Sequence, residues 1–113
     1  MAARTASSDG DPGRTVEARI DAFNRGDLAG LAGIYAPDAR IYDPPDRVRD
    51  AGADGIRAAL SRELAASSGG PIAVRDRVTQ GAFVVERESR AGSSVLVVYE
   101  VRSGRIANVW ILR

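Results

Sequence analysis

The residue of this chain whose type and position most suggest chemistry is Asp43. It stands in "RIYDPPD", residues 40–46, at the end of an alternating apolar segment and directly before two prolines. If Ala39, Ile41 and Asp43 share one face of a strand, as the two-residue period requires, the carboxylate points into apolar surroundings. Such surroundings raise the pKa of a carboxylic acid toward values suited to proton abstraction. The pattern predicts a general base at Asp43; the alternative is an aspartate that caps the Pro-Pro turn.

The composition of the chain narrows the chemistry further. Its 113 residues include no Cys and no His, and all 16 basic residues are Arg. Thiolate nucleophiles, His bases, lysine Schiff bases, the Walker lysine and His or Cys metal sites therefore have no residue to form them. What remains is proton transfer by a carboxylate, assisted by a Tyr or Arg that stabilises negative charge. We expect no cofactor and no metal, because no dense acidic motif suggests an all-oxygen Mg²⁺ site.

Charge and hydropathy indicate which partners to expect. The formal net charge is +1, and no basic run exceeds two residues, so the sequence shows no surface for nucleic acid or an anionic membrane. No apolar window is long enough to span a membrane, and the polar start lacks the apolar segment of a secretory signal. We expect a cytoplasmic protein with a disordered N-terminal arm at residues 1–12 and a single domain at residues 13–113.

Periodicity along the chain predicts an α+β fold. Helices are expected at residues 14–25 and 28–36 and from Asp54 onward, the first two capped by Asp11 and Asp27. "ARIYD" is expected to be a strand, and "PPDRVRDAGAD" a loop because adjacent prolines lack N–H donors. The following segments alternate as consecutive hairpin strands: 71–80, 82–89, 93–102 and 105–113. The helices should therefore cover one face of a curved antiparallel sheet.

Three segments resemble a known family. They are "AFNRGDLAGLAGIYAPDARIYDP", "GADGIRAALSRELA" and "YEVRSGRIANVWILR". Over roughly residues 14–112 the chain resembles the nuclear transport factor 2-like superfamily, and in particular its SnoaL-like and ketosteroid-isomerase-like branch. The resemblance implies a cone, in which a curved antiparallel sheet wraps around three helices of the N-terminal half and leaves an apolar cavity open at one end.

The resemblance also implies candidate site residues. The family's general-base aspartate, followed by Pro, matches Asp43, whereas its oxyanion-hole tyrosine falls on Arg19 and its protonated aspartate on about Val97. One of the three catalytic identities is thus present. Arg19, beside the buried stripe of its helix, could replace the tyrosine, or it could extend along the helix edge to water. Tyr99 could supply a hydroxyl to the cavity, or it could be a core residue bonded to backbone.

Other residues were assigned by the face on which they should lie. Glu86 and Glu88 share a strand face and could be paired acids, although their Arg-rich neighbours favour a solvated face. Tyr35 and Tyr42 are expected in the core, and the alternative is that they line the cavity. We expect the ligand pocket to be lined by Ile41, Val97, Val109, Ile111 and Phe23.

Two functions of different classes follow. The first is a cofactor-independent isomerase, cyclase or hydratase, similar to steroid delta-isomerases or polyketide cyclases, which acts on a small hydrophobic carbonyl compound or epoxide with Asp43 as base. The second is a non-catalytic module for ligand binding or dimerisation. A homodimer is expected through the outer sheet face, where Asn108, Trp110 and Leu112 alternate. If Asp43 is the base, it should meet Arg19 across the cavity as a buried ion pair.

Overall fold

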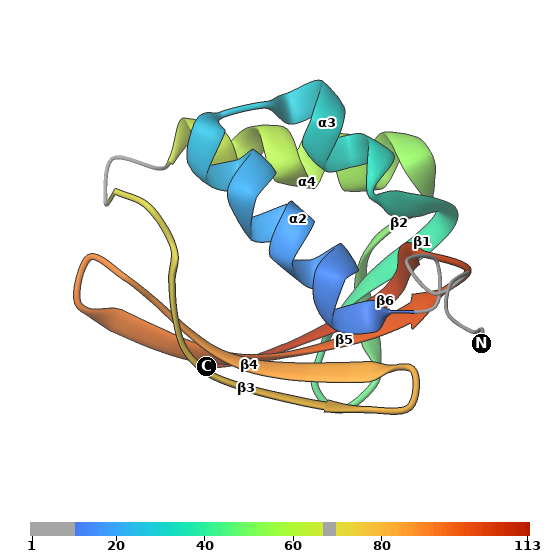
Figure 1. Ribbon diagram of the computed structural model, residues 1–113. Coiled ribbons are helices and arrows are strands. Elements are labelled where there is room, and N and C mark those ends of the chain that lie inside the picture. The colour runs from blue at the N-terminus through green and yellow to red at the C-terminus, as the bar shows by residue number, and fades with distance from the viewer. Residues whose placement is uncertain (1–10, 67–69) are drawn as a thin grey trace.

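Helices lie against one face of a curved, six-stranded sheet in the computed structural model of the chain, which describes residues 11–66 and 70–113 (Figure 1). The elements are α2 (Pro12–Arg25), α3 (Leu28–Gly33), β1 (Tyr35–Asp43), β2 (Arg47–Ala51), α4 (Gly52–Ala65), β3 (Ala73–Gln80), β4 (Phe83–Arg90), β5 (Ser93–Arg102) and β6 (Arg105–Leu112). This arrangement confirms the predicted α+β class, with a curved sheet around three helices.

The strands are ordered β2-β1-β6-β5-β4-β3. The last four strands form the predicted meander of antiparallel hairpins. β1, however, lies parallel to β6, so the sheet is not wholly antiparallel as expected. This parallel contact brings the end of β1 and the end of β6 to the same edge of the apolar interior.

Helix α2 positions a charged residue on a buried face. The Asp11 side chain accepts a hydrogen bond from the Arg14 backbone N–H at 3.3 Å, and the helix ends at Gly26, which has a φ of 72°. The buried face of α2 includes Val16 and Phe23, together with Arg19. Residues 1–10 of the expected arm lie outside the described residues, whereas residue 12 already belongs to the helix.

Helix α3 is shorter than the predicted helix at residues 28–36. It ends at Gly33, and Tyr35 begins β1 instead of closing a helical stripe. The reason is a sheet contact: the Ile106 N–H donates to the Ile34 carbonyl oxygen at 2.9 Å and draws the chain alongside β6. Tyr35 is consequently buried against the sheet, only 6% exposed.

The expected loop after the two prolines was a wrong prediction. Residues Arg47–Ala51 form β2, which pairs antiparallel with β1. Pro44 and Pro45 occupy the turn between the two strands, so their missing N–H groups remove no bond from the ladder. α4 follows directly, two residues before the expected start at Asp54.

The outer face of the sheet, opposite the helices, has a continuous apolar row. Cross-strand neighbours in the six strands are Val48, Tyr42, Trp110, Val98, Val85 and Val78. Residues opposite one another on paired strands share a face, so these side chains adjoin across the whole sheet. The Tyr42 and Trp110 rings stack with centroids 5.1 Å apart. Within the described residues, no helix is long and apolar enough to cross a membrane.

Candidate active site in the cavity

A cavity of about 660 Å³ lies between the inner face of the sheet and the helices α2 and α4. Its walls combine charged and apolar side chains, and they include four of the five residues expected to line a pocket: Ile41, Val97, Val109 and Ile111. Phe23 is not among the lining residues. It is 3% exposed and lies behind two guanidinium groups, those of Arg19 and Arg90, which stand 5.6 and 5.1 Å from its ring centroid. That any of these residues contacts a ligand stays a prediction.

Arg19 projects from α2 into this cavity instead of reaching along the helix to water. Its residue is only 6% exposed, and its guanidinium is held on two sides. Nε donates to the Tyr35 hydroxyl at 3.1 Å, and Nη2 pairs with Glu63 Oε1 of α4 at 3.3 Å. The third nitrogen, Nη1, is buried and has no hydrogen-bond partner among the described residues. A buried donor without a partner is costly, so an acceptor that reached this nitrogen would be bound favourably.

Tyr35 contributes a hydroxyl that the sequence assigned to the core. Its oxygen accepts the bond from Arg19, which leaves its own hydrogen free to be donated. The side chain lines the cavity. The position expected for the oxyanion tyrosine is occupied by Arg19, and a tyrosine from another element thus stands beside it.

Glu88 and Tyr99 form a second polar pair on the sheet. The Tyr99 hydroxyl donates to Glu88 Oε2 at 2.6 Å, and both residues line the cavity. Tyr99 therefore lies in the cavity, as the first of its two interpretations required. Its hydroxyl binds a carboxylate and not the backbone, as the second would have required. Its catalytic role stays a prediction.

Burial controls the charges in the cavity. It raises the pKa of Glu88 to about 7, although Arg19 lowers that value in part. Burial also raises the pKa of Tyr35 and, more strongly, that of Tyr99, so both hydroxyls stay protonated near neutral pH. Burial lowers the pKa of Arg19, but the surrounding hydroxyls and carboxylates raise it well above its usual value, and the cation persists. The cavity thus combines a fixed cation with a carboxyl group that titrates near neutrality.

The solvated face expected for Glu86 and Glu88 was a wrong prediction. Glu86 is 0% and Glu88 6% exposed, on the same inner row of β4 as Val84. Glu86 pairs with Arg77, its direct neighbour on β3. The Arg-rich neighbourhood that suggested solvent instead supplies a counter-ion at the edge of the sheet, because Arg77 extends from water inward to the acid.

The family of the chain follows from a comparison with known families. The model of a family described as SnoaL-like domain matches residues 16–109. The chain belongs to the SnoaL-like family. No curated protein matches this SnoaL-like chain significantly.

Solved structures agree with this assignment. A cystatin-fold protein from Novosphingobium aromaticivorans is similar with a TM-score of 0.80 and 23% identity, over 91% of this chain and 98% of that one. Wild-type IdmH from Streptomyces antibioticus, described as a candidate polyketide cyclase, has a TM-score of 0.74 and 25% identity, over 90% and 91%. TerC, co-crystallised with polyporic acid, has a TM-score of 0.72 and 19% identity, over 89% of both chains. The SnoaL-like chain therefore has a nuclear transport factor 2-like fold.

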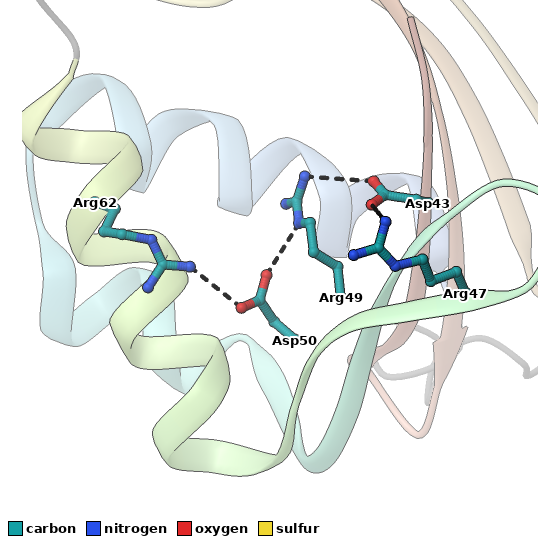
Figure 2. A network of polar contacts seen from close by, with 5 residues as sticks. All are labelled: Asp43, Arg47, Arg49, Asp50 and Arg62. Carbon is teal, nitrogen blue, oxygen red and sulfur yellow. Dashed lines mark hydrogen bonds and ion pairs between the residues drawn. The ribbon is translucent and has the colours of Figure 1, made fainter.

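Asp43 does not share the cavity with Arg19 in this SnoaL-like protein. It is not among the lining residues, and its carboxylate instead contacts the guanidinium groups of Arg47 at 3.9 Å and Arg49 at 3.7 Å (Figure 2). The alternation with Ala39 and Ile41 gave the correct side of the strand. β1 ends at Asp43, however, beyond the cavity wall, where the returning β2 offers cations. The expected ion pair between Asp43 and Arg19 is therefore absent from the described residues.

A neighbouring acid that the sequence did not single out fixes two arginines of the cavity wall. Asp50, with a side chain 12% exposed, accepts hydrogen bonds from Arg49 Nε at 3.1 Å and Arg62 Nη2 at 3.2 Å (Figure 2). Both arginines line the cavity. Asp50 thus offsets the charges of the two arginines from outside the cavity. β2 and α4 set the positions of these arginines.

Proposed function

We propose that this SnoaL-like protein is a cofactor-independent enzyme that moves a proton on a small hydrophobic carbonyl compound, in an isomerisation or cyclisation. One observation carries the proposal: a carboxyl group with a pKa near neutrality, Glu88, shares a cavity with the buried pair of Arg19 and Tyr35. The similarity to IdmH, a candidate polyketide cyclase, supports it. The base is thus Glu88 rather than Asp43.

The reaction begins with proton abstraction. The ionised Glu88 carboxylate removes a proton from the carbon beside the carbonyl, and the electron pair of that C–H bond moves onto the carbonyl oxygen as an enolate. Arg19 Nη1 and the Tyr35 hydroxyl hydrogen, which have no other described acceptor, would stabilise this oxyanion. Both residues are buried, and preorganised donors that are shielded from water are worth more than donors in water.

The second step distinguishes the two reaction types. In an isomerisation, protonated Glu88 returns its proton to a different carbon of the same enolate, which reforms the carbonyl. In a cyclisation, the enolate carbon attacks a second carbonyl of the substrate, and the proton goes to the new alkoxide oxygen. Tyr99 orients Glu88 through its 2.6 Å hydrogen bond, and Glu63 holds Arg19. Both steps leave the base ready for another turnover.

Exchange of carbon-bound hydrogen tests the proposal without a known substrate. We expect the protein to accelerate the exchange of the α-hydrogens of 2-tetralone for deuterium in D₂O, measured by proton NMR. The rate should rise with pH through an apparent pKa of about 7, because Glu88 must be ionised to act as base. Detectable binding of the ketone without faster exchange would instead indicate the alternative, a non-catalytic binding module.

We also propose that the protein forms a homodimer through the outer sheet face. The apolar row across all six strands, with Trp110 at its centre and Phe83 6.5 Å from the Trp110 ring, is more extensive than the single strand stripe that first suggested it. Exposed side chains extend it, including Val78 at 63% and Leu112 at 39%. A contiguous apolar patch of this kind marks an interface.

The dimer gives a direct test by sedimentation at micromolar concentration. We expect wild-type protein to sediment as a dimer and Trp110→Glu as a monomer, because the new carboxylates would be buried against one another. Arg57→Glu, which places a carboxylate at an exposed position of α4, away from the outer sheet face, should remain dimeric. A monomeric wild type, or a Trp110→Glu dimer of unchanged affinity, would refute this interface.

A further inference from the structure

Arginines line one end of the cavity in a number that the proposed reaction does not use. The lining includes Arg49, Arg62, Arg90 and Arg113 besides Arg19, against two acids, Glu63 and Glu88. Arg49 and Arg62 are paired with Asp50. Of the other arginines, Arg90 is the last residue of β4, and its side chain lies on the inner face of the sheet.

Arg90 is a partly buried cation that lacks a described counter-ion. It continues the inner row of β4 two residues beyond Glu88, and its guanidinium lies over the Phe23 ring at 5.1 Å from the centroid. Nη1 is buried without a hydrogen-bond partner, and no ion pair joins Arg90 to any of residues 11–66 and 70–113. The nearest acid in its row, Glu88, is engaged by the Tyr99 hydroxyl.

The geometry points to a substrate that carries a carboxylate, which Arg90 binds while Arg19 faces the reacting carbonyl. A planar guanidinium with unpaired N–H groups can bind a carboxylate in bidentate fashion. Arg19 also has a buried, unpartnered Nη1, and both guanidiniums contact the one Phe23 ring. Both guanidiniums therefore lie beside the same ring, close enough for one elongated small molecule to reach the two.

The contact with Phe23 explains why Arg90 suits this task better than a flexible surface arginine. A guanidinium attracted to the face of an aromatic ring is more restricted than one that is free in water. Less conformational entropy is then lost when an anion binds. This inference rests on the proposed function for the carbonyl end of the ligand, whereas the carboxylate contact is independent of catalysis.

Equilibrium binding of a matched pair of compounds tests the inference. 6-Carboxy-2-tetralone and its methyl ester differ in charge at one position, and calorimetry gives their affinities without turnover. We expect wild-type protein to bind the acid about 10-fold more tightly than the ester, because a hydrogen bond to a charged group is worth roughly that factor. Arg90→Gln should lose this preference while its affinity for the ester is unchanged.

Two further variants serve as controls. Arg87→Gln changes the exposed arginine of β4 that pairs with Asp76 and should keep the full preference. Arg90→Lys keeps the charge without the bidentate fork and should keep part of it. Equal affinity of wild type for acid and ester, no binding of the acid at millimolar concentration, or an unchanged preference in folded Arg90→Gln would overturn the inference. A preserved preference without deuterium exchange would refute only the proposed catalysis.

Discussion

Replacement of Arg19 by leucine is expected to lower the free energy of unfolding by about 3 kcal/mol at pH 8, the lower end of the range for breaking a buried ion pair. The substitution removes the donor to Tyr35 and the cation beside Glu63 and Glu88. The Glu63 side chain is 38% exposed, so water screens its charge when Arg19 is removed. Most of the lost stability therefore comes from the other groups of the cavity. Urea denaturation gives the value.

A double-mutant cycle identifies the acid that Arg19 compensates. We expect Arg19→Leu combined with Glu88→Gln to recover more than half of the loss, because no uncompensated carboxylate then remains at the cavity wall. Asp43→Asn, whose carboxylate pairs outside the cavity, should recover nothing. Arg57→Leu, an exposed arginine of α4, should change the stability by less than about 0.5 kcal/mol. Rescue by Asp43→Asn alone would show that the structural assignment is wrong.

Strand periodicity predicted the apolar part of the cavity well. Ile41, Val97, Val109 and Ile111 were placed on inner faces by alternation alone, and all four line the cavity. The reason is physical: a slip by one residue would turn every apolar side chain of a strand to water, so the pattern fixes the face. The burial of Arg19 had a similar signal, because it lies between the buried Val16 and Phe23 on α2.

Alternation could not show where the cavity ends along a strand. Asp43 has the parity of Ile41, and that alone suggested a buried acid. The end of β1, the turn at Pro44 and the arginines of β2 decide its surroundings, and these depend on the pairing of β2 with β1. A residue at the end of a strand can lie on the inner face of the sheet and still have no other element packed over it, so it is not buried.

The polar residues of the site come from elements far apart in the sequence: besides Arg19 on α2 and Tyr99 on β5, three further elements contribute. Tyr35 begins β1, Glu63 lies on α4, and Glu88 lies on β4. Two of them had a usable signal: Glu88 alternates with the buried Val84 through Glu86, and Glu63 follows Leu60 by three residues on the apolar stripe of its helix. Charge alone favours a solvated position for Glu88, and Glu63 was not singled out. Tertiary contact with Tyr99 and the nearby Arg19 offsets the cost of burying Glu88.

Replacement of Glu88 by glutamine is expected to slow the deuterium exchange of 2-tetralone by about 10²- to 10⁴-fold, the usual contribution of a general base. Glutamine can still accept the Tyr99 hydrogen bond, so the cavity should keep its shape and its affinity for the ketone. Asp43→Asn is the matched control, and its exchange rate should equal that of the wild type. Slow exchange in Asp43→Asn with a normal rate in Glu88→Gln would return the role of base to Asp43.

The same substitution should raise stability, with a sign that follows from the pKa of Glu88. Its folded value, about 7, lies above the ordinary 4.5, so the folded state binds the proton more tightly than the unfolded state. The stability of the wild type therefore falls as pH rises between these two values, and above pH 7 the full cost of an ionised Glu88 is present.

Glu88→Gln removes this cost of an ionised Glu88. Urea denaturation at pH 8 should show the variant more stable by on the order of 2 kcal/mol, with the difference vanishing near pH 4. A gain in stability together with a loss of exchange is the combination expected of a residue kept for proton transfer at the expense of the fold. A destabilised variant at pH 8 would contradict the raised pKa of Glu88 and, with it, the assignment of Glu88 as a base at neutral pH.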